Sequence, residues 1–332
     1  MSCLFRKTEK RRTTPLIEFT ERGSQRQGRH SGFLFPPSNE GVPRKVFLAS
    51  ISPTPHRRGV IRFAVLGSGS AGNAAVVECG GLRLMIDAGL SAKQLSLRLH
   101  QIGVDPASLD GILLTHEHGD HVRGLKIFLK QNPVPVFTTA ATARVVREAG
   151  IDGGTWKFFE AGQVFAIGGI AVETFAIQHD AVDPVGFVVG DAARRLGFLS
   201  DAGFVTRSVT ERLRGLDGIF VEANYDEDLL EADTKRPWSI KQRISSRHGH
   251  LSNSQVTELI RDIAHPALGR VVLGHLSSDC NSPEIILASL RECLTELGHG
   301  HVELHCACQH EPSPWFVLGT TPVLATATED HQ

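Results

Sequence analysis

Short apolar runs rich in β-branched residues recur along the chain from about residue 60 onward. Each run ends at turn-forming or polar residues, a pattern typical of buried or half-buried strands. The runs interpreted as strands are 62–66, 74–79, 82–86, 111–115, 136–139, 170–177, 186–189, 196–199, 218–222 and 271–273.

Apolar residues at helical spacing occur in three further segments. Segment 91–100 starts at a Ser, segment 252–265 starts at a Ser/Asn cap, and segment 283–297 opens with Pro in its first turn. The strands come in clusters before helices. This order fits an α+β fold with two β-sheets sandwiched by outer helices better than a regular alternation of strands and helices.

The first 59 residues lack this periodicity and are rich in Arg, Ser, Pro and Gly. Residues 1–58 hold twelve Lys or Arg and four Glu, a charge of +8, so the remainder of a chain of net charge −1 carries −9. A solvated basic disordered tail, a transit peptide and upstream sequence from a mis-assigned start are the alternatives, and the four Glu argue against a transit peptide. We expect residues 1–59 to lie outside the fold, a single folded domain to span 60–320, and 321–332 to form a short tail.

The composition, with 41% hydrophobic and 21% charged residues, is close to the average for soluble globular proteins. No apolar run approaches the roughly 20 residues that span a bilayer, so no membrane association is expected. The cysteines are scattered, which indicates free thiols in a reducing compartment and a cytoplasmic location. The oligomeric state is left open. The six cysteines are Cys3, Cys79, Cys280, Cys293, Cys306 and Cys308.

Residues 116–121, with the sequence HEHGDH, are the sharpest chemical signal. Three imidazoles and a carboxylate within six residues suit zinc, iron and related ions. Two pairs on one short loop can hold two ions side by side: His116 with His118, and Asp120 with His121. A solvated His-rich loop is the alternative.

Three later residues each stand where an apolar strand meets a polar loop: His179, Asp201 and His275. A single strand-end His or Asp is usually a turn or cap residue. Because all three follow the HEHGDH run in order, we interpret them as further ligands.

The HxHxDH run with a later His, Asp and His resembles the metallo-β-lactamase superfamily. The resemblance implies an αββα sandwich of two mixed β-sheets, and a hydrolase whose two divalent ions, Zn or Mn, lower the pKa of water from 15.7 to about 7. It also implies that Asp87 supports the His loop from behind, although a strand-end turn residue is the alternative. The implied ligands are His116, His118 and His179 for one ion, Asp120, His121 and His275 for the other, and Asp201 as the bridge.

Glu222 and His250 resemble a Glu/His pair of the tRNA 3′-processing nucleases in this superfamily. There the pair lies beside the metals and helps to deliver a proton to the leaving oxygen. Each residue alone would more often be a cap or turn residue. Together with Asp120, we expect them to be catalytic.

A basic stretch, residues 235–250, holds five Lys or Arg and no acid. Basic side chains interleaved with an aromatic suit a phosphate backbone and stacked bases, and a solvated helix face explains the stretch equally well. The candidate substrate-binding residues are Lys235, Arg236, Lys241, Arg243 and Arg247.

Residues 63–318 resemble one branch of the superfamily, the YycJ (WalJ)-like metallohydrolases. The resemblance rests on segments 66–73, 87–91, 179–186, 222–226, 249–253 and 274–281. It implies a DNA exonuclease linked to repair, so the expected function is that of a two-metal-dependent hydrolase, a phosphodiesterase or exonuclease acting on DNA. One alternative is a small-molecule metallohydrolase of the thioesterase or lactonase type, and a thioester does not require Glu222 and His250. The other is a binding protein on an inactive scaffold.

Two other segments are assigned structural roles. Segment 67–73 lacks the phosphate-loop pattern and is followed by a strand, so we expect a tight turn with Ser68, Ser70 and Asn73 near the metal cleft. The alternation within 302–308 predicts a strand with one buried face rather than a zinc site. About seventy residues separate Asp201 from His275, too few for the large domain that β-CASP nucleases insert there.

Overall fold

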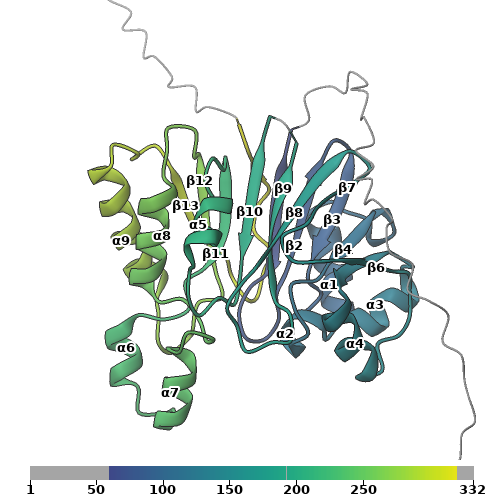
Figure 1. Ribbon diagram of the computed structural model, residues 1–332, viewed down its shortest axis with the longest axis horizontal. Helices are drawn as coiled ribbons and strands as arrows, with labels where there is room; N and C mark the ends of the chain where they lie inside the picture. Colours follow the sequence, from purple (N-terminus) through teal and green to yellow (C-terminus); the bar gives the residue numbers. More distant parts are fainter. Residues whose placement is uncertain (1–59, 192, 320–332) are drawn as a thin grey trace, which may run out of the picture. The chain divides into compact units, whose positions relative to one another are not determined.

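A computed structural model describes residues 60–191 and 193–319. The expectations for residues 1–59 and 321–332 fall outside the described part of the chain. The expected αββα sandwich is confirmed: two seven-stranded sheets pack face to face, and helices cover their outer faces (Figure 1).

The first sheet has the strand order β14-β1-β2-β3-β4-β5-β6. Strands β3 to β6 are parallel, and β14, β1, β2 and β3 pair antiparallel. In that order the strands are Phe316–Val317, Arg62–Gly67, Ala74–Cys79, Leu82–Ile86, Gly111–Leu113, Val136–Thr139 and Trp156–Phe159.

The second sheet has the order β13-β12-β11-β10-β9-β8-β7. Strands β10 to β13 are parallel, and β7 to β10 pair antiparallel. In that order the strands are Glu303–Cys306, Arg270–Gly274, Gly218–Glu222, Arg195–Leu199, Val185–Gly190, Ile170–Ala176 and Val164–Ile167.

The helices lie in the two outer layers and within the loops near the ends of the sheets. The three predicted helices are confirmed as α1, α8 and α9, and α8 opens with a capping box between Ser252 and Gln255. Among the helices of residues 60–319, none has both the length and the apolar character needed to cross a bilayer. The helices are α1 Ala92–Gln101, η1 Pro106–Ser108, α2 Gly119–Val122, α3 Leu125–Gln131, α4 Ala140–Glu148, α5 Arg207–Arg212, α6 Glu227–Ala232, α7 Trp238–Ile244, α8 Asn253–Ile263 and α9 Pro283–Glu296.

The sheets are buried on both faces, which explains the uninterrupted apolar runs of the central strands. In β11, Phe220 contributes to the core between the sheets, while Ile219 and Val221 pack in the core under α5, α8 and α9. Helices α1 and α3 cover the outer face of the first sheet in the same way.

Two expectations differ from the structure in detail. The predicted strand 111–115 ends at Leu113, because the chain turns toward the second sheet and the Thr115 carbonyl accepts a hydrogen bond from Val185 N (3.0 Å). The predicted alternation over 302–308 gives a strand only at Glu303–Cys306, and Cys308 is exposed beyond its end. The cysteines within residues 60–319 are free, as expected.

Candidate active site

The expected site residues converge at one edge of both sheets. Strands β10, β11 and β12 are parallel, so their C-terminal ends lie together and bring Asp201, Glu222 and His275 to the same edge. Strands β3 and β4 of the other sheet also end at this edge, and the loops that follow them carry Asp87 and His116. The C-terminal edge of parallel strands is the usual position of binding sites in such sheets.

The backbone is unusual at three of these positions. Asp87, Asp201 and His275 have φ values of 60°, 54° and 52°, and they are the non-glycine residues with positive φ in the described part of the chain. Left-handed backbone costs about 1–3 kcal/mol at a non-glycine residue and is concentrated at functional sites. All three residues follow strand ends closely, so this conformation turns their side chains into the cluster.

One group consists of three imidazoles. The ligand atoms of His116, His118 and His179 lie within 4.8 Å of one another. His179 Nδ1 is 2.9 Å from the Gly249 carbonyl. Because a carbonyl only accepts, Nδ1 donates, and the lone pair of His179 Nε2 faces His118 Nδ1 at 3.2 Å.

Asp201 lies at the centre of the second group. Its Oδ2 is 2.9 Å from His121 Nε2 and its Oδ1 is 2.8 Å from His275 Nδ1. Burial opposes a charge on all three residues. The two imidazoles nevertheless lower the pKa of Asp201 well below its usual range, and the nearby carboxylates raise the pKa of His275 to about 10. The arrangement therefore favours a carboxylate surrounded by positive charge.

Asp120 lies beside this group, and its Oδ2 is 3.6 Å from His121 Nε2 and 3.8 Å from His275 Nε2. The turn after β1 also reaches the site, as the sequence predicts. Asn73 Nδ2 donates to Asp120 Oδ2 (3.3 Å), and Ser68 Oγ accepts from His275 N (2.7 Å).

The donor set fits divalent cations. His116 Nε2 is buried and has no hydrogen-bond partner within residues 60–319. Burial, assisted by the neighbouring His121, holds the pKa of His116 well below its usual value. The imidazole is therefore neutral with a free lone pair, the form that binds metals. Imidazoles and carboxylates are ligands that zinc and manganese take from proteins, and a cation beside Asp201 would replace the protons on His121 and His275 as its positive partner.

Glu222 and His250 contact each other and the ligand cluster. His250 Nδ1 is 3.0 Å from Glu222 Oε2 and 3.3 Å from Asp201 Oδ1. Glu222 is fully buried, and its other oxygen accepts hydrogen bonds from the backbone N–H groups of Ala202 and Leu251. Although burial opposes its charge, His250 lowers the pKa of Glu222. The ionised carboxylate thus fixes the orientation of the His250 ring.

Asp87 and Thr115 support the cluster from beneath. Asp87 Oδ2 lies 2.8 Å from His121 Nδ1, while Asp87 Oδ1 accepts from Thr115 N at 2.9 Å. Thr115 Oγ1 is also 3.0 Å from His116 Nδ1. A carboxylate behind a ligating histidine fixes its tautomer and orientation.

Replacing Asp87 with Ala is expected to weaken metal binding by about 10- to 100-fold. Titration against a competing chelator measures the affinity. The Asp87→Asn variant separates charge from backbone, because Asn tolerates the left-handed conformation. Asp152→Ala, at an exposed position away from the site, serves as the control, and an unchanged affinity in Asp87→Ala would exclude the supporting role.

More of the positive charges in the basic stretch, residues 235–250, are paired with carboxylates than the sequence suggests. Lys235 and Arg236 form ion pairs with Asp279, and Arg236 also pairs with Asp233. Arg243 pairs with Asp180 (2.6 Å).

The two other basic residues of the stretch, Lys241 and Arg247, form no ion pair within the described residues. Lys241 Nζ donates to the Glu231 carbonyl, and the Arg247 guanidinium lies 4.5 Å from the centre of the Phe204 ring. They are the cations of the stretch that remain available to phosphates.

Asp180 is a site residue that the sequence reasoning does not identify. Its Oδ1 lies 3.3 Å from His179 Nε2 and 3.9 Å from His118 Nε2. Partial burial opposes its charge, but the hydrogen bond from Arg243 lowers its pKa. Its position directly after a candidate ligand is the one signal in the sequence that could have indicated it.

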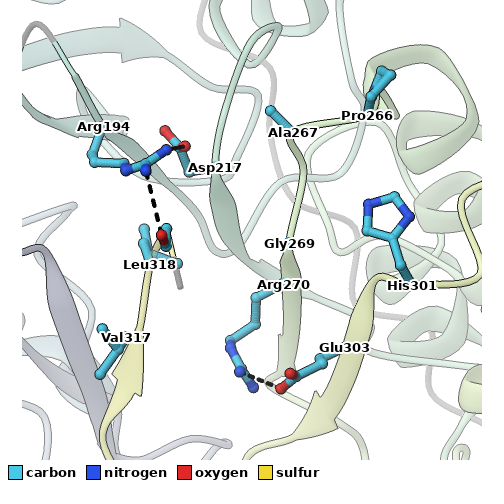
Figure 2. Close-up of a pocket in the computed structure, with 11 residues that line it drawn as sticks. Arg194, Asp217, Pro266, Ala267, Gly269, Arg270, His301, Glu303, Val317 and Leu318 are labelled. Atoms are coloured by element: carbon cyan, nitrogen blue, oxygen red, sulfur yellow. Dashed lines mark hydrogen bonds and ion pairs between the residues drawn. The ribbon is translucent and has the colours of Figure 1, made fainter. Parts of the chain in front are cut away.

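A pocket separate from the His/Asp cluster lies at the other end of the second sheet, beside the first residues of β11, β12 and β13 (Figure 2). Its volume is about 290 Å³. Its arginines are already paired, Arg194 with Asp217 at 2.7 Å and Arg270 with Glu303. Because these charges compensate one another, the His/Asp cluster remains the better candidate for catalysis.

Comparison with known proteins gives the same superfamily as the motifs. A family model described as beta-lactamase superfamily domain matches residues 82–276. Exodeoxyribonuclease YycJ of Bacillus anthracis is 32% identical over 242 residues, which cover 72% of this chain and 91% of that protein. Exodeoxyribonuclease WalJ of Streptococcus pneumoniae serotype 2 is 32% identical over 229 residues, covering 68% and 84%.

A solved structure supports the fold. The metallo-beta-lactamase fold protein YhfI from Bacillus subtilis matches with a TM-score of 0.60 at 16% identity. The match covers 76% of this chain and 99% of that chain.

Proposed function

The chain belongs to the beta-lactamase superfamily, in the branch of the YycJ and WalJ exodeoxyribonucleases, and we propose that it is a two-metal-dependent phosphodiesterase that degrades DNA as an exonuclease. The observation that carries this proposal is the hydrogen-bonded Glu222–His250 pair in contact with the ligand cluster. A phosphodiester releases an alkoxide, which needs a proton, whereas a thioester releases a thiolate that can depart without one. The geometry therefore favours phosphodiester hydrolysis over the thioesterase alternative.

In this proposal the site would hold two divalent cations, Zn or Mn. The buried, unpartnered Nε2 of His116 and the central position of Asp201 support the assignment. The His-rich ligands favour Zn, and the carboxylates also accommodate Mn. His116, His118 and His179 would hold one ion, Asp120, His121 and His275 would hold the other, and Asp201 would serve both.

Bound ions supply Lewis acidity, which acidifies water and stabilises negative charge on phosphoryl oxygens. The protein residues then move the protons. Asp120 Oδ2 faces both His121 and His275, where it can accept a proton from the attacking water. His250 Nδ1–H donates a hydrogen bond to Glu222 and keeps its proton. His250 Nε2–H then delivers its proton to the leaving oxygen of the substrate.

We expect the purified chain to release nucleotides stepwise from end-labelled DNA in the presence of Mn or Zn, and to lose this activity in EDTA. Single-stranded DNA, duplex DNA and RNA are compared, and the position of the label gives the direction of digestion. Product ladders on denaturing gels are the readout.

The Asp120→Asn variant is the control for contaminating nucleases, and metal analysis accompanies each assay. Products that persist in this variant would show that they come from another enzyme. A protein that holds two metals and cleaves none of the nucleic acids would overturn the nuclease proposal and favour a small-molecule ester as substrate.

A further inference from the structure

Helix α7, Trp238–Ile244, exposes the ring of Trp238, which the other described residues leave largely uncovered. None of its residues is buried, and Trp238 is 68% exposed. Burial of an apolar stripe normally stabilises a short helix. Other contacts must therefore hold α7 in place.

Contacts at both ends anchor the helix. Before α7, Arg236 pairs with Asp233 and Asp279, both at 2.9 Å. At its C-terminal end, Ile244 packs against the small apolar cluster of Tyr225, Leu230 and Cys280. These contacts fix the position of α7 without any contribution from the exposed face of Trp238.

Helix α7 is connected directly to the candidate active site. Arg243 binds Asp180, whose Oδ1 lies 3.3 Å from His179 Nε2. The loop after the helix is packed tightly, because a Cβ on Gly249 would come within 2.1 Å of the Ile244 carbonyl oxygen. Arg243 follows Trp238 by five positions, an axial rise of about 7.5 Å at 1.5 Å per residue. Helices α2, α6 and α7 lie at the same end of the strands in Figure 1.

The charge around Trp238 suits a polyanion. Lys241 follows Trp238 by three residues and so lies on the same side of the helix. It forms no ion pair among residues 60–319, and its ammonium donates to the Glu231 carbonyl. Arg247, beyond the end of the helix, also has no carboxylate partner within those residues.

We propose that Trp238 is a stacking platform for an unpaired base of a single-stranded DNA end, with Lys241 beside the adjoining phosphate. This inference rests on the proposed function and specifies its substrate. A base in a blunt duplex is already stacked and paired, whereas an unpaired base offers its face to an aromatic side chain. About two stacked nucleotides at 3.4 Å spacing cover the helix between Trp238 and Arg243. The enzyme should therefore prefer single strands and overhangs to blunt ends.

Replacing Trp238 with Ala is expected to raise KM for a single-stranded oligonucleotide by about 5- to 100-fold, the range for loss of one base–aromatic stack, with kcat changed less than about twofold. Trp238→Phe should restore most of the affinity. Phe158→Ala is the matched control, because Phe158 is an exposed aromatic on β6, at the edge of the other sheet.

Binding is measured separately from cleavage in the Asp120→Asn background. Oligo-dT should quench tryptophan fluorescence, and the additional Trp238→Phe substitution should remove most of the quenching. Lys241→Ala should lower the slope of log affinity against log salt concentration by about 0.7.

Equal KM values for Trp238→Ala and Phe158→Ala, or quenching that survives Trp238→Phe, would overturn the platform. Dissociation of a dimer on Trp238→Ala, seen by sedimentation, would also overturn it and assign this face to a second copy of the chain. If no nucleic acid is cleaved but Trp238-dependent quenching by oligo-dT persists, the platform stands and the nuclease proposal fails.

Discussion

Replacing Asp201 with Asn is expected to lower kcat on DNA by about 10³-fold or more and to reduce the metal content from two ions per chain to one. Asp201 is 1% exposed and lies between His121 Nε2 and His275 Nδ1. Metal-assisted charge stabilisation contributes several kcal/mol, and each 1.36 kcal/mol is tenfold in rate. Activity assays and elemental analysis of the purified protein measure the two effects.

The Asn substitution is chosen because it preserves the backbone. Asn tolerates the φ of 54° at this position, so the loss reflects the charge rather than a strained turn. Asp217→Asn is the matched control, because Asp217 is a buried carboxylate paired with Arg194 at the opposite end of the sheet. An Asp201→Asn protein that kept two ions and a tenth of the activity would exclude the bridging role.

The second large effect is expected for His250→Ala, which should lower kcat on DNA by about 10²- to 10⁴-fold, the usual contribution of a positioned general acid. The loss should be less than about tenfold on a p-nitrophenyl phosphodiester, because nitrophenolate leaves without a proton. The metal content should not change. Comparing the two substrates therefore tests proton delivery itself.

His248→Ala is the control, since His248 is an exposed histidine in the same loop. The structure contains a specific competing possibility, because His250 Nδ1 also lies 3.3 Å from Asp201 Oδ1, within a group that could hold a cation. If His250→Ala slows both substrates equally and loses metal, His250 is a ligand and not the acid.

The two predictions test different halves of the same arrangement. Asp201 belongs to the proposed metal site, whereas His250 is proposed to act on the leaving group. Glu222 connects them: it orients His250 at 3.0 Å and lies 3.6 Å from His275 Nδ1. If kcat on DNA falls in only one of the two variants, the role proposed for the other residue is wrong.

Part of the fold was predictable because the signals are local. The apolar runs of β2, β3, β5 and β11 match the predicted ranges at both ends. Side-chain alternation and burial on both faces determine such runs wherever they lie in the sheet. The predicted ranges omit the edge strands β6 and β7. Lys157 interrupts the apolar run of β6, and β7 has only four residues, of which Val164 is exposed.

The basic stretch shows a limit of sequence reasoning about charge. Five cations without an acid suggest a continuous phosphate-binding surface. Lys235 and Arg236, however, are neutralised by Asp279, more than forty positions away. Only the folded chain decides which cations remain free, since ion pairing depends on contacts between distant segments.

The sequence by itself determined the class of fold and the candidate ligands, because strand ends and metal-binding side chains can be recognised position by position. The Glu222–His250 pair was indicated by resemblance to the tRNA 3′-processing nucleases. Only the tertiary structure decided that Asp180 adjoins His179, that Asp87, Asp201 and His275 adopt left-handed backbone, and that α7 leaves Trp238 uncovered. The reason is physical: ligand type is a property of one residue. Orientation, strain and exposure are set by the packing of segments that lie far apart in the chain.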